Sequence, residues 1–335
     1  MSGQSRPSHP SGQSRPSARV VLVNWRRADL TLRAARSVQV QLAEGDRLVV
    51  VDNASGDGSA ERLREAGLDV IETRENLGFG AGVNAGAAGM TQEVLVLLNN
   101  DAVAEAGFLD ALVGPLDGSR PRLGATTALM LLAGRWRRAT AQEEALVRAD
   151  GARWARVDEQ AAAAGEGTVL VNSTGNVVDA SGNGQDRDWL VPLEELDAPA
   201  EVFGVCGGAC AVRAEVWRRL GGLREDLFMY YEDTDLSWRL HEHGYEVAFV
   251  RGAVVHHEHA ASSGTGSDMF VRVNTRNRVL VAVEHAPARV ALAALARTAA
   301  RALRSGPRGP VARGGAQALG ALPRAVRRRA RRPRR

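Results

Sequence analysis

One stretch of this sequence, Val94-Leu95-Val96-Leu97-Leu98-Asn99-Asn100-Asp101, sets five apolar residues directly before two amides and a carboxylate. The apolar run predicts a buried strand. A carboxylate that follows such a strand lies at the edge where open α/β sheets bind ligands. About 130 residues further on, Phe228-Met229-Tyr230-Tyr231 precedes Glu232-Asp233-Thr234-Asp235. A second acidic group with aromatic neighbours is typical of a base beside a sugar-sized pocket, so the pair suggests a metal-held diphosphate facing a general base.

Similar apolar runs alternate with helical patterns on the N-terminal side of this stretch. Strands are expected at 19–24, 47–52, 69–73 and 93–98, with helices at 30–42, 60–66 and 79–88 between them. Asp29 is the expected cap of the first helix. Solidly apolar strands that alternate with helices predict an α/β fold with a parallel sheet covered on both faces.

The rest of the chain has weaker patterns. A helix is expected at 104–116, and the Ala-rich segment 139–164 reads as a helix or an irregular excursion. Further expected elements are a strand and turn at 169–179, a small apolar segment at 202–212, helices at 214–220 and 234–243, a strand at 245–250, and a helical stretch over 276–304.

The composition is that of a soluble globular protein. The chain has 335 residues, 44% hydrophobic and 24% charged, which fits one large or two small domains. No apolar run approaches the ~18–20 residues that span a bilayer. Residues 1–17 lack the apolar core of a signal peptide, so we expect a disordered leader on a cytoplasmic protein. Cys206 and Cys210 are expected to be buried, reduced thiols.

Charge is distributed unevenly along the chain. Residues 286–335 contain 14 arginines and no acid, so the net charge of +4 leaves −10 for residues 1–285. A basic tail of this kind usually binds an anionic membrane surface or nucleic acid. Nucleic acid is disfavoured because the tail lacks aromatic residues for stacking. In 286–304, one helical face carries Arg289, Arg297, Arg301 and Arg304, and another carries Leu292, Leu295, Ala299 and Leu303.

Two motifs near the predicted sheet edge suggest contacts to a nucleotide. Asp52 ends the second strand, where a carboxylate can accept from a base or a ribose hydroxyl; alternatively, it holds an Asx turn. The loop from Asn76 to Asn84 contains Gly78, Gly80 and Gly82. These glycines let the backbone pass close to a ligand or to a neighbouring helix, and the two asparagines are able to reach a nucleotide.

Asp101 and a later histidine run are the candidate metal ligands. A single carboxylate is compatible with Mg²⁺ or Mn²⁺, since water and phosphate oxygens complete the coordination; a turn or helix cap is the alternative role for Asp101. His256-His257-Glu258-His259 follows the strand at 245–250 and a further apolar run. One of these histidines could be a further ligand or steady a phosphate.

Glu232, Asp233 and Asp235 open an expected helix. Acids in a first turn are favoured by the helix dipole, and Asp235 is spaced to pair with Arg239. The alternative is that Asp233 serves as a general base, with Glu232 as the next candidate.

Seven motifs in this order resemble the family-2 glycosyltransferases of GT-A fold, in particular their bacterial rhamnosyltransferase-like branch. The resemblance runs from about Arg19 to about His285 and is loose over 120–200. Its carriers are residues 20–25, 50–59, 76–80, 97–101, 207–210, 228–236 and 276–278. The motif Asn99-Asn100-Asp101 departs from the usual Asp-x-Asp of the family.

The resemblance implies a GT-A fold, with a Rossmann-like nucleotide half, a mixed central sheet and a C-terminal helical basic tail. The expected division is a leader at 1–17, a catalytic domain at 18–285 and the tail at 286–335. The resemblance implies that catalysis is carried by Asp233 and Glu232 and that the metal is bound by Asp101, His256 and His257. It implies nucleotide binding by Asn24, Asp52, Asn76, Gly78, Asn84 and Asn100. The acceptor or sugar pocket would be lined by Gly207, Gly208, Tyr231 and Asp235.

The implied activity is inverting transfer of a sugar, with rhamnose the leading candidate, from a nucleoside-diphosphate sugar to a hydroxyl group. A glycan or a lipid-linked acceptor is expected, in cell-envelope polysaccharide synthesis at the inner face of the membrane, with Mg²⁺ or Mn²⁺ as cofactor. A catalytically silent sugar-nucleotide or glycan-binding protein of the same fold is the alternative. The two amides of Asn99-Asn100-Asp101 favour that alternative, whereas the complete acidic motif at Glu232 opposes it.

Overall fold

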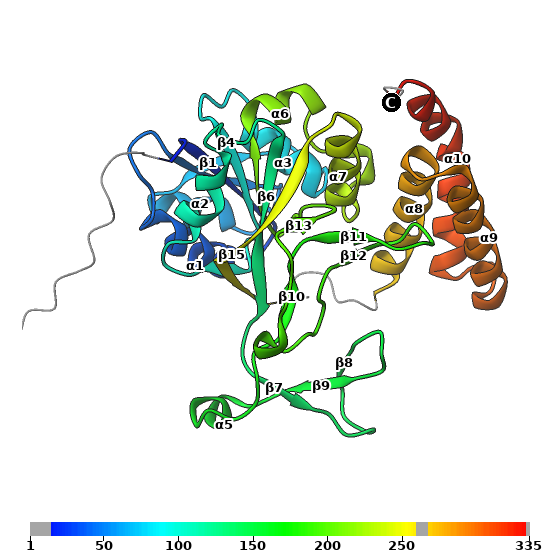
Figure 1. Ribbon diagram of the computed structural model, residues 1–335, viewed down its shortest axis with the longest axis horizontal. Coiled ribbons are helices and arrows are strands. Elements are labelled where there is room, and N and C mark those ends of the chain that lie inside the picture. The colour runs from blue at the N-terminus through cyan, green and yellow to red at the C-terminus, as the bar shows by residue number, and fades with distance from the viewer. Residues whose placement is uncertain (1–14, 259–266, 333–335) are drawn as a thin grey trace, which may run out of the picture.

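The computed structural model describes residues 15–258 and 267–332 and is built around one mixed sheet (Figure 1). Its ten strands are β1 (Ala18–Asn24), β2 (Arg47–Asp52), β3 (Asp69–Glu72), β4 (Val94–Leu98), β5 (Ala102–Ala104), β6 (Leu123–Leu132), β10 (Val171–Ser173), β13 (Glu201–Val202), β14 (Ala209–Arg213) and β15 (Glu246–His257). Eight follow the order β13-β15-β6-β14-β4-β1-β2-β3, while β10 pairs with β6 and β5 with β15.

The first half of the sheet is parallel. β1 pairs in parallel with both β2 and β4, and β2 pairs in parallel with β3. β14 then runs antiparallel to β4 and β6, and β15 runs parallel to β6. The carboxyl ends of β1, β2 and β4 therefore meet at one edge, where a ligand site is expected in an open α/β sheet.

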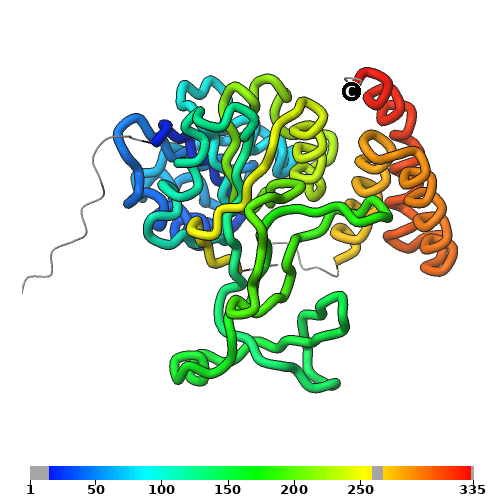
Figure 2. Tube along the Cα trace, viewed as in Figure 1, coloured from blue at the N-terminus to red at the C-terminus, as the bar shows by residue number. Residues whose placement is uncertain are grey.

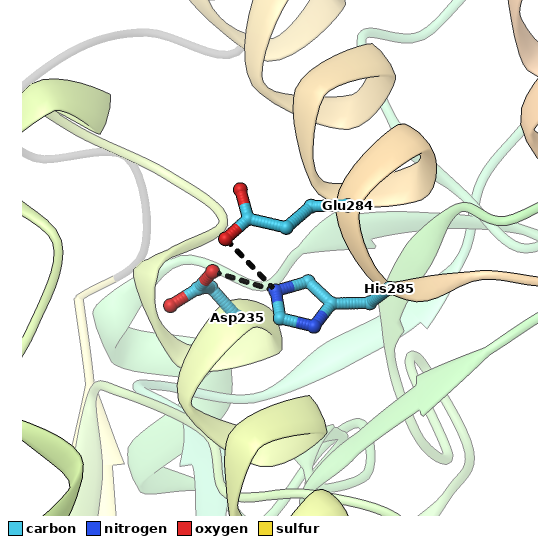
Figure 3. Close-up of side chains that lie close together, drawn as sticks. All are labelled: Asp235, Glu284 and His285. Carbon is cyan, nitrogen blue, oxygen red and sulfur yellow. Dashed lines mark hydrogen bonds and ion pairs between the residues drawn. The ribbon is translucent and has the colours of Figure 1, made fainter. Parts of the chain in front are cut away.

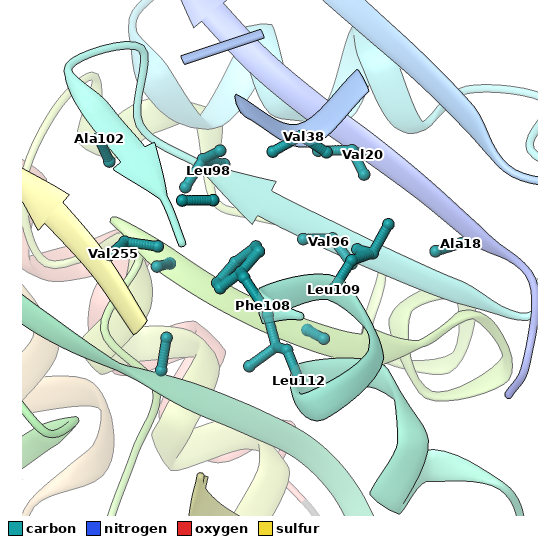
Figure 4. Packing of buried hydrophobic residues seen from close by; sticks show 14 of the residues in the cluster. Ala18, Val20, Val38, Val96, Leu98, Ala102, Phe108, Leu109, Leu112 and Val255 are labelled. Atoms are coloured by element: carbon teal, nitrogen blue, oxygen red, sulfur yellow. The ribbon is translucent and has the colours of Figure 1, made fainter. Parts of the chain in front are cut away.

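Helices cover both faces of the sheet. One face carries α1 (Ala28–Gln39), α2 (Ser59–Glu65) and α4 (Phe108–Val113), and the other carries α3 (Phe79–Ala87), α6 (Ala214–Leu220) and α7 (Glu232–Glu242). Figure 4 shows Phe108 and Leu109 of α4 beside Val96 and Leu98 of β4. Neighbouring residues of a strand point alternately to the two faces of the sheet. Because helices cover both faces, a central strand must be apolar along its whole length.

The α/β class and the mixed central sheet confirm the fold expected from the sequence. Residues 47–52 and 214–220 form the predicted strand and helix with the predicted bounds. Asp29 is not the cap of α1: Arg27 holds that position, and Asp29 lies in the first turn, where it pairs with Arg62.

Several predictions for residues 102–257 need correction. The expected helix at 104–116 is instead β5, α4 and a short 3₁₀ turn at Gly114–Leu116. Strand β6 is not indicated by the sequence patterns, although all ten of its residues are buried. The strand expected at 245–250 continues to His257 as β15. This extension carries the histidines to the edge that holds Asp101.

Two excursions leave the central sheet (Figure 1). One is a three-stranded sheet of β7 (Trp136–Arg138), β9 (Arg153–Arg156) and β8 (Leu146–Val147), followed by the short helix α5 (Glu159–Ala163). The segment 139–164 is therefore mostly irregular. The other excursion is a hairpin of β11 (Asn176–Val178) and β12 (Gly184–Asp186), whose tip reaches the C-terminal helices.

The C-terminal part of the molecule is helical. It consists of α8 (Asp268–His285), α9 (Ala288–Ser305) and α10 (Pro310–Ala330), which lie side by side at one end of the molecule (Figure 2). Val279, Leu280 and Val283 of α8 share a core with Ala291 of α9 and Ala318 of α10. Among the described helices, none is long and apolar enough to cross a bilayer. The expected leader lies mostly in 1–14, outside the described residues.

Candidate active site

The ends of β4 and β15 bring a carboxylate and an imidazole together. His257 Nε2 lies 3.0 Å from Asp101 Oδ1, and Glu258 N donates to the Asp101 carbonyl at 3.0 Å. Asn172 Oδ1, which can only accept, is 2.7 Å from His257 Nδ1, so Nδ1 carries the hydrogen. The Nε2 lone pair of His257 therefore faces a carboxylate, while Nδ1 donates its hydrogen to a neighbouring acceptor. Metal-binding histidines usually have this arrangement.

His256 has a different environment. Successive side chains of a strand point to opposite faces, and His256 Nε2 pairs with Glu105 at 2.7 Å instead of Asp101. Of the two predicted metal ligands, His257 therefore faces Asp101, whereas His256 faces Glu105. His259 lies outside the described residues.

Asp233 stands at the N-terminus of α7, opposite the end of β4. Its Oδ2 accepts from Gly207 N at 3.1 Å, and its Oδ1 accepts from Thr234 N at 2.6 Å. The next glycine, Gly208, accepts from Asn99 N at 2.8 Å. Two consecutive glycines thus connect Asp233 to the strand that ends in Asp101. Burial raises the pKa of Asp233, although these hydrogen bonds oppose the rise, which suits a carboxylate that must take up a proton.

The aromatic loop before α7 is strained. Phe228, Tyr230 and Tyr231 have φ values of 66°, 69° and 73°, a left-handed region that costs such residues energy. Asn277 of α8 holds the loop in place: its Nδ2 donates to the carbonyls of Leu227, Met229 and Tyr230 at 3.0, 2.8 and 2.8 Å. Backbone strain fixed by a buried amide is typical of sites where a catalytic group must be oriented.

Glu232 is buried at 4% exposure, and its Oε1 has no hydrogen-bond partner among the described residues. Burial, with the charges of Asp233 and Asp235 adding to it, raises the pKa of Glu232 to about 8. Glu232 is therefore predominantly protonated at neutral pH, which makes it a poor general base beside Asp233.

Asp186 at the end of β12 is an acid that the sequence did not single out. The residue as a whole is exposed, but many protein atoms surround its carboxyl, and the loss of solvent there raises its pKa. The charge of Asp233 raises that pKa further, and the charge of His257 lowers it, which places Asp186 within electrostatic reach of both. No local pattern marks Asp186, because a short hairpin strand has no characteristic spacing.

The residues expected to touch the nucleotide form an internal network. Asp52, 1% exposed, accepts from Asn24 Nδ2 at 2.7 Å and from Ser55 N at 2.9 Å. Asn24 is fully buried, and Asn100 donates to Thr31 Oγ1, which donates to Asn24. Asp52 and Asn24 therefore shape the strand-end loop, because their side chains are enclosed and already hydrogen-bonded. For Asp52 this fits the Asx turn given as the alternative. Asn100, which is half-buried, belongs to the same network.

The glycine-rich loop also has a structural role. A Cβ on Gly78 (φ +92°) would come impossibly close to the Phe228 carbonyl, and the same carbonyl accepts from Phe79 N at 2.7 Å. Asn84 exchanges hydrogen bonds with the backbone of Leu223 at 2.9 Å in each direction. Gly78 and Asn84 thus contact the loop on the α7 side of the site. Asn76 Oδ1 accepts from Gly78 N at 3.0 Å and fixes the same loop.

Asp235 is not part of a sugar pocket. It is fully buried, and its oxygens bind Arg239 at 2.7 Å, His285 at 2.9 Å and Arg224 at 3.2 Å. Figure 3 shows Asp235, Glu284 and His285 together. Two acids and a histidine so close could hold a metal, but two arginines already neutralise the carboxylates. The prediction is corrected: Asp235 joins α7 to α8. Gly207 contacts Asp233, Tyr231 feels the charge of Asp233, and Gly208 borders Asn99 and Met130.

The fold and the site together define a GT-A glycosyltransferase. Comparison with known proteins gives the same answer. Residues 19–140 match the model "Glycosyl transferase family 2", and residues 149–275 match "Glycosyl transferase family group 2". An N-acetylglucosaminyl-diphospho-decaprenol L-rhamnosyltransferase of Mycobacterium tuberculosis, found in two strains, is 30% identical over 256 residues, which cover 71% of this chain and 72% of the relative. The chain belongs to glycosyltransferase family 2 and resembles its rhamnosyltransferases.

Solved structures share the fold at low sequence identity. A mannosyltransferase from Pyrobaculum calidifontis, in complex with GDP-Man and Mn²⁺, has a TM-score of 0.51 at 17% identity and covers 98% of this chain and 76% of its own. GalNAc-T7 with UDP, GalNAc and Mn²⁺ has a TM-score of 0.55 at 16% identity, with 82% of this chain and 51% of its own covered.

Proposed function

We propose that this glycosyltransferase inverts the anomeric centre of a sugar as it moves that sugar from a nucleoside diphosphate to an acceptor hydroxyl. The observation that carries this proposal is the position of Asp233. One glycine pair, Gly207-Gly208, holds its carboxylate and the end of β4 together. A base on one side and a diphosphate site on the other support a single displacement.

Asp233 would accept the proton of the acceptor hydroxyl as the new glycosidic bond forms. Its raised pKa brings the carboxylate closer to the working pH, where a general base is most effective. Hydrogen bonds from Gly207 N and Thr234 N keep the carboxylate oriented. Asp186, within electrostatic reach of Asp233, would favour transfer of the proton to the pair of carboxylates.

Asp101 and His257 are the residues that would hold Mg²⁺ or Mn²⁺. Carboxylate oxygen and imidazole nitrogen are suitable donors, and Asn172 orients the ring. When bound, such an ion offsets the charge that develops on the leaving nucleoside diphosphate. Asn99 borders the same position, 3.4 Å from His257 Nε2.

The name of the Mycobacterium tuberculosis relative supports a proposal for the donor and the acceptor. Its name describes an L-rhamnosyltransferase that acts on N-acetylglucosaminyl-diphospho-decaprenol. We propose dTDP-rhamnose as the donor, a sugar linked to a lipid through a diphosphate as the acceptor, and cell-envelope polysaccharide synthesis as the process. A lipid-linked acceptor further suggests that the protein works on the cytoplasmic face of the membrane.

The C-terminal helices supply a surface that fits an anionic bilayer. Leu292 and Leu303 of α9 are 66% and 85% exposed, and Leu319 and Val326 of α10 are 59% and 53% exposed. Each pair lies on one side of its helix, since spacings of seven and eleven residues are close to two and three turns. Exposed apolar residues among many arginines are characteristic of helices that lie in a membrane interface.

The test is a donor screen followed by transfer. We expect dTDP-rhamnose with Mn²⁺ to raise the melting temperature more than UDP- or GDP-sugars do, because a ligand of the native state stabilises it. Transfer to a short-chain lipid diphosphate of N-acetylglucosamine should then give one product with inverted anomeric configuration. Stronger stabilisation by a different sugar nucleotide would show that dTDP-rhamnose is not the donor. A product of retained anomeric configuration would contradict the proposed mechanism.

A further inference from the structure

Three arginines gather where α8, α9 and the β11–β12 hairpin meet. Arg278 of α8 donates through Nη1 to Asn183 Oδ1 at 3.1 Å and through Nη2 to Thr298 Oγ1 at 2.8 Å. Thr298 lies between Arg297 and Arg301, which are four residues apart and so share one side of α9. Figure 2 shows the tip of the hairpin, in green, beside these helices.

No ion pair joins these three charges to an acid within residues 15–258 and 267–332, the described part of the chain. Asp179 lies within electrostatic reach of Arg278 but does not pair with it. Arg278 Nε is buried without a hydrogen-bond partner among the described residues. Burial lowers the pKa of Arg278 and the nearby charges of Arg301 and Arg297 lower it further, while Tyr231 and Asp179 oppose the change. Like charges held together in this way are stabilised when an anion lies between them.

This cluster is next to the proposed base. Consecutive residues of the hairpin make the connection: Asn183 binds Arg278, and Gly184 packs so closely on Thr234 that a Cβ there would clash with its hydroxyl. Thr234 follows Asp233 directly and also accepts from Asn176 at 3.1 Å. Tyr231 feels the charges of both Arg278 and Asp233, so it lies within electrostatic reach of each. An anion bound by the arginines would therefore lie near a molecule that presents its hydroxyl to Asp233.

We propose that Arg278, Arg297 and Arg301 bind the diphosphate of the acceptor and so select acceptors that carry one. This inference rests on the proposed function and adds a subsite on the side of Asp233 opposite the donor. Guanidinium groups suit the task, because their planar forks match phosphate oxygens bidentately. A phosphate group could also come from a lipid headgroup of the bilayer, and the experiment separates the two sources.

The experiment measures binding of geranyl diphosphate to the full chain in EDTA, by calorimetry, so that neither donor nor metal is needed. The test variant is Arg297→Gln/Arg301→Gln, because both side chains are exposed and their replacement should not disturb folding. The control is Arg308→Gln/Arg324→Gln, which removes the same charge from exposed positions in the α9–α10 connection and on α10. Binding of inorganic pyrophosphate, of geraniol and of phosphatidylglycerol vesicles is measured in the same way.

We expect the dissociation constant for geranyl diphosphate to rise at least tenfold in the test variant and less than twofold in the control. Pyrophosphate should show the same pattern, and geraniol should show no dependence on either change. Equal loss in both variants, or no binding of geranyl diphosphate by the unaltered chain, would overturn the proposal. Loss of vesicle binding alone would assign the cluster to lipid headgroups and overturn it as well. If the binding result holds but no sugar is ever transferred, the proposed function fails and the anion site stands.

Discussion

Asp233 carries the carboxylate on which the proposed chemistry depends. Asp233→Asn keeps the shape but cannot take a proton, and its one oxygen can accept from only one of Gly207 N and Thr234 N. We expect turnover to fall by about 10²–10⁴-fold, the range for loss of a general base, with donor affinity within about twofold of the original. Since the pKa values of Asp233 and Asp186 are both raised, kcat/KM of the unaltered enzyme should rise with pH as these carboxyls ionise. Near-normal turnover of the variant would move the base elsewhere.

Asp101 and His257 should act as a pair. Asp101→Asn and His257→Ala each remove one donor, and we expect either to weaken Mn²⁺-dependent binding of the nucleotide sugar about 10–100-fold. His256→Ala is the matched control, because that ring pairs with Glu105. Titration calorimetry with and without Mn²⁺ gives the comparison. A His256→Ala effect as large as that of His257→Ala would contradict the assignment.

Glu232 gives a stability prediction with a defined sign. Its pKa is raised to about 8 in the folded protein, against roughly 4.3 in an unfolded chain. Its contribution to stability is thus fully present below the unfolded value and is lost as pH rises through the folded one. Glu232→Gln stays neutral, so the variant should gain stability relative to the original as pH rises from about 5 to about 9.

Urea denaturation across that pH range measures the difference. One pKa unit corresponds to about 1.4 kcal/mol, so the change should be readily detected. Glu61→Gln, at an exposed acid in the first turn of α2, is the control. Parallel pH profiles for the original and Glu232→Gln would show that Glu232 is already ionised at neutral pH.

At the scale of elements, the junction between α8 and the loop before α7 positions the base. Asn277→Ala removes three hydrogen bonds to carbonyls of a strained loop. We expect kcat to fall at least tenfold, while donor binding, which involves the other side of the site, changes little. Asn274→Ala is a control on the same helix, since that amide only binds its own helix at Phe270 O. Loss of donor affinity in parallel with kcat would indicate general damage to the fold instead.

The strands and helices that the sequence predicts best are those with local signals. β2 has four consecutive aliphatic residues, and α6 is delimited by Arg213 and Gly221. β6 escapes prediction because its threonines and glycine interrupt the apolar pattern, although Thr126 and Thr127 are fully buried. Thr126 donates to the Leu112 carbonyl, and Thr127 accepts from Cys206 N. Those partners lie outside the strand, so no local pattern could indicate that the hydroxyls would be satisfied.

The site is predictable in the same partial way. Asp101 faces His257, and Asp233 is connected to the same strand end through Gly207 and Gly208. The sequence does not indicate that Asp52, Asn84 and Asp235 are already hydrogen-bonded within the protein, since short polar residues in such loops bind backbone and ligands with the same atoms. Which role they have depends on burial, and Asp52 and Asp235 are enclosed by segments far away in the chain.

For the molecule as a whole, the basic C-terminal helices lead to a prediction about membranes. We expect sedimentation with phosphatidylglycerol vesicles at low salt and release at high salt, because screening weakens the attraction of arginine for anionic lipid. Leu292→Ser/Leu303→Ser should reduce the bound fraction several-fold. Val40→Ser/Leu77→Ser is the control, because these exposed apolar residues lie on the sheet domain. Full-length protein that stays in the supernatant at low salt would refute the membrane proposal.

These helices are more than an appendage. Arg329 donates to the carbonyls of Val283 and Ala286 at 2.8 and 2.6 Å, and Arg332 pairs with Glu242 of α7. His285 also binds Glu242, at 2.6 Å. Burial opposes protonation of His285, but its hydrogen bonds to Asp235 and Glu242 outweigh burial and raise its pKa. Removal of everything after His285 would therefore expose apolar residues of α8 and free buried charges, so point substitutions are the better probe of membrane binding.

The position of β14 in the sheet has a consequence for synthesis on the ribosome. β4 is synthesised early and pairs with β1, but its other edge stays unpaired until β14 is made. The ribosome must first synthesise the chain from Leu98 to Arg213. At about 5–20 residues per second, that interval lasts roughly 6 to 23 seconds. Meanwhile the newly made strand Val94–Leu98 presents unpaired backbone groups and aliphatic side chains, which other nascent chains can pair with. Fast production would therefore favour inclusion bodies, and slower translation or a chaperone that covers this edge should raise the yield of folded enzyme.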